Sequence, residues 1–200
     1  VSETPLIKTF FISADKEFEF KTGQFVEVTL DGIGEAPYTP SSSPYVKEKM
    51  ELTIMKAGYV TGKMHELKGG ETIGIRGPYG KGYPIEKFYG KEILILGGGV
   101  GLAPLRCLIL TLLEEEDKFK KINICFGAKT PADFIYKDWF DELKNHKNVE
   151  LFRSVDKADE DWNETEGVVT VLLDQIKTDY KEIVSIVCGP PIMMKFGAKR

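Results

Sequence analysis

The residues best suited to chemistry follow an apolar run near the middle of the chain. Residues 93–96 are apolar, and residues 97–106 read GGGVGLAPLR. A strand that turns through glycines into a helix leaves backbone N–H groups unpaired where the helix dipole is positive, which stabilises a bound anion. The turn therefore predicts a phosphate site, although Leu102 replaces the third glycine of the G-x-G-x-x-G fingerprint, and tight packing alone is an equal alternative. The candidate contacts are Gly99, Val100, Gly101, Leu102, Ala103 and Pro104, with Pro104 at the first helical position.

A second candidate is Cys188, which ends the apolar run 183–188 and precedes the sequence GPPIM. Ligands of open α/β sheets bind at the carboxyl ends of strands, so Cys188 would lie near the glycine turn. A single cysteine at a strand end is more often inert packing. Without its neighbours in the sequence, Cys188 is therefore interpreted as a packing residue.

The segments that position these residues change in kind near residue 90. Before it, short segments rich in β-branched and aromatic residues alternate with turn formers, which is typical of antiparallel strands. After it, apolar strands alternate with helical patterns, including one at 134–143, which indicates a mostly parallel sheet covered on both faces. The sequence thus predicts an antiparallel barrel domain over residues 1–89 and an α/β domain over residues 90–200. The strands expected in the first domain are 7–12, 24–30, 51–55 and 71–76.

Composition argues against several classes of function. The net charge is −4 and no basic cluster is present, which argues against nucleic acid as a partner. The longest apolar stretch, 102–113, falls short of the ~20 residues of a membrane-spanning helix. Cys107, Cys125 and Cys188 form no CxxC pair, so we expect no disulfide, no metal site and a reducing, cytoplasmic setting.

Taken together, the motifs occur in an order that resembles the ferredoxin–NADP reductase superfamily over nearly the whole chain. The resemblance rests on the glycine turn and on APYTPSSSP at 36–44, MKAGYVTGKMHEL at 55–67, RGPYG at 76–80 and VCGPPIMM at 187–194. It implies that the first domain is a Greek-key β-barrel that binds FAD and that the α/β domain binds NAD or NADP.

The resemblance also implies roles for individual residues. Tyr38 would lie against the flavin ring, and Thr39 would offer its hydroxyl and N–H near flavin N5, the atom that takes the hydride. The arginine that usually opens this motif is Ala36 here, and we expect Lys56 to replace it beside the flavin pyrophosphate. Cys188 would face the nicotinamide, so Thr39 and Cys188 are the expected catalytic residues. The other expected cofactor contacts are Pro40, Ser41, Met55, Gly58, Val60, Thr61, Gly189, Pro190 and Met193.

The function implied is that of a flavin-dependent oxidoreductase that passes hydride between NAD(P)H and FAD, and on to a redox partner protein or an iron–sulfur centre. A non-catalytic dinucleotide-binding subunit for assembly or sensing is the alternative, because the flavin arginine is absent. The loop at 127–136 contains Lys129 as its one basic residue, and residues 156–161 are mostly acidic. Both features favour NAD over NADP.

Within the superfamily, the chain looks most like the electron-transfer subunits of anaerobic hydrogenases, sulfite reductases and dihydroorotate dehydrogenases. In that subgroup a tail beyond the Cys-Gly-Pro-Pro-x-Met motif carries cysteines for an iron–sulfur cluster, whereas this sequence ends at Arg200. We therefore expect the second domain to be shortened at its C-terminus, and any cluster to belong to a missing tail or to a partner subunit.

Overall fold

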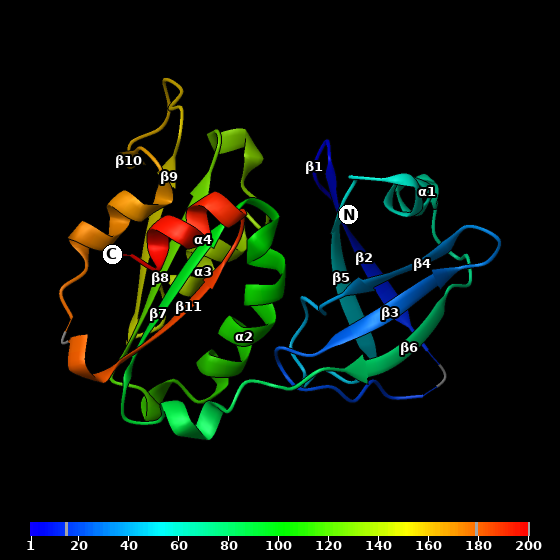
Figure 1. Cartoon of the computed structure of the whole chain (residues 1–200), viewed down its shortest axis with the longest axis horizontal. Helices are drawn as coiled ribbons and strands as arrows, with labels where there is room; N and C mark the ends of the chain where they lie inside the picture. The colour runs from blue at the N-terminus through cyan, green and yellow to red at the C-terminus, as the bar shows by residue number, and fades with distance from the viewer. Residues whose placement is uncertain (15, 179, 200) are drawn as a thin grey trace.

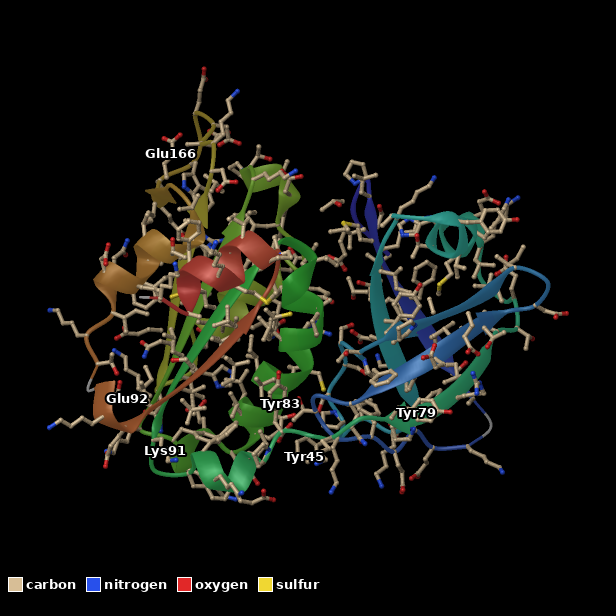
Figure 2. All side chains as sticks on the ribbon, in the orientation of Figure 1. Tyr45, Tyr79, Tyr83, Lys91, Glu92 and Glu166 are labelled. Atoms are coloured by element: carbon tan, nitrogen blue, oxygen red, sulfur yellow. The ribbon has the colours of Figure 1, made fainter. Side chains whose placement is uncertain are left out.

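Two halves with different kinds of β-sheet lie side by side in the chain (Figure 1). The computed structural model describes residues 1–14, 16–178 and 180–199. The segment that joins the halves contains η1 (Ile85–Phe88), and Tyr83 lies in this segment at the junction between the halves (Figure 2).

Two three-stranded antiparallel sheets form the N-terminal half. One, in the order β1-β2-β5, contains β1 (Ser2–Thr4), β2 (Ile7–Ser13) and β5 (Lys49–Met55). The other, in the order β4-β3-β6, contains β4 (Gly34–Tyr38), β3 (Phe25–Leu30) and β6 (Gly74–Tyr79). Every second residue of β3 is buried, because one face of the strand meets the core and the other meets solvent. Val28 of β3, Leu52 of β5 and Met64 of α1 (Tyr59–Glu66) share that core, so the two sheets enclose one interior.

A five-stranded parallel sheet in the order β10-β9-β8-β7-β11 forms the C-terminal half. Its strands are β7 (Glu92–Gly98), β8 (Lys121–Ala128), β9 (Val149–Val155), β10 (Thr165–Glu166) and β11 (Ile183–Cys188). One face packs against α2 (Leu102–Glu114) and α3 (Trp139–Leu143), and the other against η5 (Val169–Gln175) and α4 (Pro191–Gly197). The shorter 3-10 segments are η2 (Gly99–Gly101), η3 (Glu116–Lys118), η4 (Pro131–Asp133) and η6 (Tyr180–Glu182).

Helix α2 lies between the sheet of the C-terminal half and the N-terminal half (Figure 1). Leu105, Leu108 and Ile109 pack toward the parallel sheet. Cys107, on another side of the same helix, packs into the core of the N-terminal half with Val28 and Leu52. Both halves therefore bury side chains of α2, which explains why residues 102–113 are so strongly apolar.

The predicted succession of antiparallel sheets and a parallel α/β sheet is confirmed. Two expectations about individual segments were wrong, and one strand was not predicted. Residues 34–38 form that strand, β4, which contains Pro37 at a sheet edge, where proline is tolerated. β6 covers 74–79 instead of 71–76, and the helix expected at 134–143 is reduced to α3. Within the described ranges, no helix is long and apolar enough to cross a bilayer.

Candidate functional site

The glycine turn after β7 forms the beginning of α2. η2 leads into the helix, whose N-cap residue Gly101 has no side chain to cap it, and the first turn contains no acidic residue. The N–H of Leu102 donates to the carbonyl oxygens of Gly99 and Val100, and no side chain caps the remaining N–H groups of the turn, which can therefore bind an anion. α2 begins at Leu102 and not, as expected, at Pro104. Pro104 is the third residue of α2 and lies in its first turn, where proline is tolerated.

Two glycines of the turn are required for different physical reasons. Gly99 has φ +56°, a left-handed conformation that glycine adopts without strain, and no atom lies within 4 Å of the place a Cβ would occupy. A Cβ on Gly101 would lie 2.6 Å from the carbonyl oxygen of Cys188. Gly99 thus leaves open space beside the turn, and Gly101 lets the start of α2 touch the end of β11.

Cys188 therefore lies where the sequence predicted, beside the glycine turn. It pairs with Gly97 in the parallel ladder between β11 and β7. The thiol is partly buried, and this burial raises its pKa, so Cys188 stays protonated near neutral pH. Met193 points back into the fold, because its sulfur lies 2.7 Å from the Cβ position of Gly98. The roles of Cys188, Gly189, Pro190 and Met193 as cofactor contacts remain predictions.

The segment expected to hold the flavin follows β4. Tyr38 ends this strand, opposite Val26 of β3. Its hydroxyl is buried and has no hydrogen-bond partner among the described residues, and burial raises the pKa of the phenol. A buried, protonated hydroxyl without an acceptor costs stability unless a ligand pairs with it. Thr39 comes next and is partly exposed, while Pro40 is buried.

In the loop that follows β5, Thr61 bonds to the backbone at the start of a helix, and its contact with a cofactor remains a prediction. Its hydroxyl accepts hydrogen bonds from the N–H groups of Ala57 at 2.9 Å and Gly58 at 2.8 Å. Thr61 therefore stabilises the start of α1 from the third helical position, while Gly58 is the N-cap residue. Met55, Lys56 and Gly58 are exposed and Val60 is partly buried, so this loop presents a positive charge to solvent.

Ser41 is committed to contacts inside the protein. It is fully buried, and its N–H donates to the carbonyl oxygen of Glu51 at 2.8 Å. Its hydroxyl lies 3.0 Å from Thr53 Oγ1 and 3.2 Å from the same Glu51 oxygen. The hydroxyl expected to contact FAD is therefore held at the junction of the halves, and a direct contact with FAD remains a prediction.

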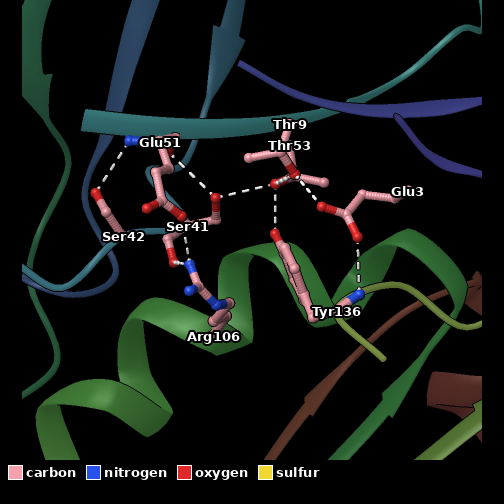
Figure 3. A network of polar contacts seen from close by, with 8 residues as sticks. All are labelled: Glu3, Thr9, Ser41, Ser42, Glu51, Thr53, Arg106 and Tyr136. Carbon is pink, nitrogen blue, oxygen red and sulfur yellow. Dashed lines mark hydrogen bonds and ion pairs between the residues drawn. The ribbon is translucent and has the colours of Figure 1, made fainter. Parts of the chain in front are cut away.

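Arg106 of α2 crosses from one half to the other (Figure 3). Its Nη1 donates to the carbonyl oxygen of Ser41 at 2.9 Å and to the carboxylate of Glu51 at 2.6 Å. The side chains of this ion pair are mostly buried, with 17% of Arg106 and 13% of Glu51 exposed. The guanidinium carbon also lies 4.7 Å from the centre of the Tyr136 ring.

Tyr136 makes a second crossing beside the first. Its hydroxyl donates to Thr53 Oγ1, and its N–H donates to the carboxylate of Glu3 at 2.9 Å (Figure 3). Burial raises the pKa of Tyr136, which keeps the hydroxyl protonated as a donor. Sequence reasoning assigned no role to Tyr136 or Glu51. Arg106 did carry a signal, since it is the only charged residue in the apolar stretch 102–113.

The arrangement fits the two groups that the resemblance implies. The unpaired Tyr38 hydroxyl and the exposed Lys56 can bind a polar, negatively charged cofactor beside the N-terminal half. The open space at Gly99 and the uncapped start of α2 can bind a pyrophosphate beside the C-terminal half. In the part of the chain that the structure describes, no group of three or more His, Cys, Asp or Glu side chains could hold a metal ion.

Two family models match the chain. The model of the oxidoreductase FAD-binding domain matches residues 1–83, and that of the oxidoreductase NAD-binding domain matches residues 95–199. Among solved structures, a ferredoxin NADP+ reductase from Neisseria gonorrhoeae with bound FAD and NADP superposes with a TM-score of 0.82 at 22% identity, covering 98% of this chain and 85% of that chain. This likeness shows the fold.

Curated relatives are similar over most of the chain. Sulfhydrogenase 1 subunit gamma of Pyrococcus furiosus is 35% identical over 183 residues, which cover 90% of this chain and 62% of that protein. A probable dihydroorotate dehydrogenase B (NAD(+)), electron transfer subunit, of Methanocaldococcus jannaschii is 35% identical over 197 residues, which cover 98% of this chain and 67% of that protein. The chain thus spans 62% and 67% of the length of these two relatives.

Proposed function

The chain belongs to the family of oxidoreductases that join an FAD-binding domain to an NAD-binding domain, and from this we propose that it transfers hydride between a nicotinamide dinucleotide and FAD. The observation that supports the proposal is the junction between the halves. α2, whose first turn would receive the dinucleotide pyrophosphate, is bonded through Arg106 to Ser41, two residues beyond Thr39. The two expected cofactor sites therefore border one interface.

When bound, the cofactors supply the redox chemistry, in which a hydride with its two electrons passes from C4 of the dihydronicotinamide to flavin N5. The protein binds and orients. The backbone N–H groups at the start of α2 would hold the dinucleotide pyrophosphate, and Lys56 would neutralise that of the flavin. The Tyr38 hydroxyl would donate a hydrogen bond to the flavin, and Thr39 would orient its ring. Cys188, which stays protonated, would pack beside the nicotinamide without acting as a nucleophile.

We propose NAD as the dinucleotide. The loop after β8 contains Lys129, and the N–H of Asp156 donates to the Ala128 carbonyl oxygen beside it at 3.0 Å. The N–H of Lys157 likewise donates to the Lys129 carbonyl oxygen at 2.9 Å, so the mostly acidic segment 156–161 begins beside this loop. Carboxylates there oppose a second phosphate group by like-charge repulsion.

The electrons then pass to a protein partner. Two of the relatives are named as subunits, one of a sulfhydrogenase and one an electron transfer subunit. We therefore propose that this chain works as the dinucleotide-oxidising subunit of a larger redox enzyme, with an iron–sulfur centre outside residues 1–200 as the next carrier.

An anaerobic visible spectrum of the purified chain, supplied with FAD, tests the proposal. We expect an oxidised flavin band that bleaches when NADH is added, and more slowly with NADPH. A chain that retains no flavin, or a flavin band that neither dinucleotide bleaches, would contradict the proposal and favour a dinucleotide-binding subunit for assembly or sensing. Faster bleaching by NADPH would overturn the choice of NAD alone.

A further inference from the structure

The contacts of Arg106 and Tyr136 connect the two expected cofactor sites over a very short path. Arg106 lies three residues, or about one helical turn, beyond Ala103 in the predicted pyrophosphate site. Its partner Ser41 lies two residues beyond Thr39 in the predicted flavin site. The path between the two sites therefore has three parts. They are the helical turn from Ala103 to Arg106, the hydrogen bond from Arg106 to Ser41, and the buried residues Pro40 and Ser41.

Water has little access to the residues of this path. Ser41 is fully buried, Thr53 is 7% exposed and Tyr136 is 9% exposed. Tyr136 has φ +55°, a conformation that only a few per cent of non-glycine residues adopt. Its N–H and hydroxyl both bond to the N-terminal half, so contacts with the other half hold the strained residue in place.

The network is not arranged for stability alone. Arg106 Nε is buried and has no hydrogen-bond partner among the described residues. A buried donor without an acceptor destabilises a protein, and a buried ion pair is often no more stabilising than apolar side chains of similar volume. What the ion pair supplies is a defined orientation between the charged groups, because a guanidinium binds a carboxylate and a carbonyl in a fixed plane.

We propose that Arg106 and Tyr136 are positioning residues that fix the distance between flavin and nicotinamide during hydride transfer. The inference rests on the proposed function. Neither side chain needs to touch a cofactor. Arg106 holds Ser41 and Glu51 of the N-terminal half against α2, the helix that would receive the dinucleotide. Tyr136, which follows β8, bonds to Thr53 and Glu3 of the same half.

The test compares Arg106→Lys with a matched control, Arg153→Lys. Arg153 also pairs with a carboxylate, that of Glu164, and lies over the rings of Phe134 and Phe140, but all these residues belong to the C-terminal half. Both variants keep the charge and lose the planar guanidinium. In Arg106→Lys we expect the single-turnover rate of flavin reduction at saturating NADH to fall about 10- to 100-fold, because a misplacement of ~1 Å costs about that much.

If the role of Arg106 is purely structural, the rate should fall in proportion to cofactor affinity. If Arg106 positions the two cofactors, we expect the dissociation constants of FAD and NAD+ in Arg106→Lys to stay within threefold of the parent chain. Arg153→Lys should change neither rate nor affinity. We also expect the absorbance of the charge-transfer complex between NAD+ and reduced flavin to weaken, since that band reports the stacking of the two rings. An unchanged rate, or a rate lost in proportion to cofactor affinity, would overturn the proposal.

A second variant and a second measurement make the test independent of folding and of the proposed function. Tyr136→Phe removes one hydroxyl and leaves the ring beneath Arg106, so it replaces Arg106→Lys if that variant fails to fold. We expect hydride transfer in Tyr136→Phe to be three- to tenfold slower. Exchange of the amide hydrogens of Thr39, Ser41 and Ser42 in the flavin-free chain should quicken in both variants and not in Arg153→Lys. If the parent chain does not reduce flavin, the proposed function fails, and unchanged exchange in the two variants would separately overturn the inference.

Discussion

The two halves offer their cofactors different kinds of groups. The C-terminal half presents backbone, with Gly99 open to solvent space and the start of α2 uncapped. The N-terminal half presents side chains, namely the unpaired hydroxyl of Tyr38 and the exposed charge of Lys56. A backbone site depends on the fold and is disturbed where an added Cβ would meet backbone, as at Gly101, whereas a side-chain site depends on residue identity and loses its contacts one at a time. We therefore expect the two halves to respond differently to substitution.

Gly101→Ala should have the largest effect. Its Cβ would lie 2.6 Å from the Cys188 carbonyl oxygen, so the start of α2 must move away from β11. Overpacking of this kind costs about 1–3 kcal/mol, and we expect a loss near the upper end together with at least about 10-fold weaker binding of NAD+. Chemical denaturation and titration with NAD+ measure the two losses, and FAD affinity should be retained.

Gly62→Ala is the matched control for that substitution. In α1 the nearest atom to its Cβ position, Lys56 Cε, is 3.9 Å away. We expect stability to stay the same or to rise by about 0.5–1 kcal/mol, as for glycine in a helix interior. If both alanines have equal effects, the close approach of α2 to β11 is not what the backbone site requires.

Thr39→Ala should have an intermediate effect confined to the side-chain site. Loss of one hydrogen bond of about 1 kcal/mol corresponds to about five- to tenfold slower flavin reduction by NADH, with FAD affinity changed less. Stopped-flow absorbance measures the rate. Thr29→Ala removes a hydroxyl bonded to Glu35 on the same half and should leave the rate unchanged. A Thr39→Ala chain as fast as the parent would remove Thr39 from the site.

The smallest effect concerns pH, and it can be assigned to each core separately. Burial raises the pKa of Cys107, in the N-terminal core, to about 11 and that of Cys125, in strand β8 of the parallel sheet, to about 12. Both thiols stay protonated in the folded chain above pH 9.0, the ordinary pKa at which unfolded thiols ionise. Their stabilising contribution is therefore complete below pH 9 and is lost as pH rises toward the folded pKa values.

Denaturation at pH 8, 9 and 10 measures this loss. At pH 10 each thiol should cost about 1 kcal/mol relative to pH 8. Cys107→Ala and Cys125→Ala should each reduce the loss of stability between pH 8 and pH 10 by about 1 kcal/mol, whatever they do to stability at pH 8. Equal slopes in all three chains would mean that neither thiol is buried as described.

How much could be predicted also differs between the halves. The glycine turn and Cys188 follow uninterrupted apolar strands, and parallel strands place their carboxyl ends together, so local sequence sufficed to bring these residues to one place. In the N-terminal half, β4 contains Gly34 and Pro37, which do not indicate a strand in the sequence. The strand forms because β4 lies at a sheet edge, which tolerates residues that a central strand excludes. Arg106, Ser41 and Tyr136 each bond to residues that are far from them in the sequence. No local sequence pattern indicates such contacts.

Because α2 places Cys107 in one core and Leu105 in the other, the structural boundary runs through a helix and not through the linker around Tyr83. If either half unfolds, α2 loses the core that packs against one of its sides. We therefore expect the two halves to unfold cooperatively. The same feature constrains recombination among relatives. A chimera joined in the linker would pack the N-terminal core of one relative against α2 of another. Its α2 would need a small residue at position 107 to fill that core.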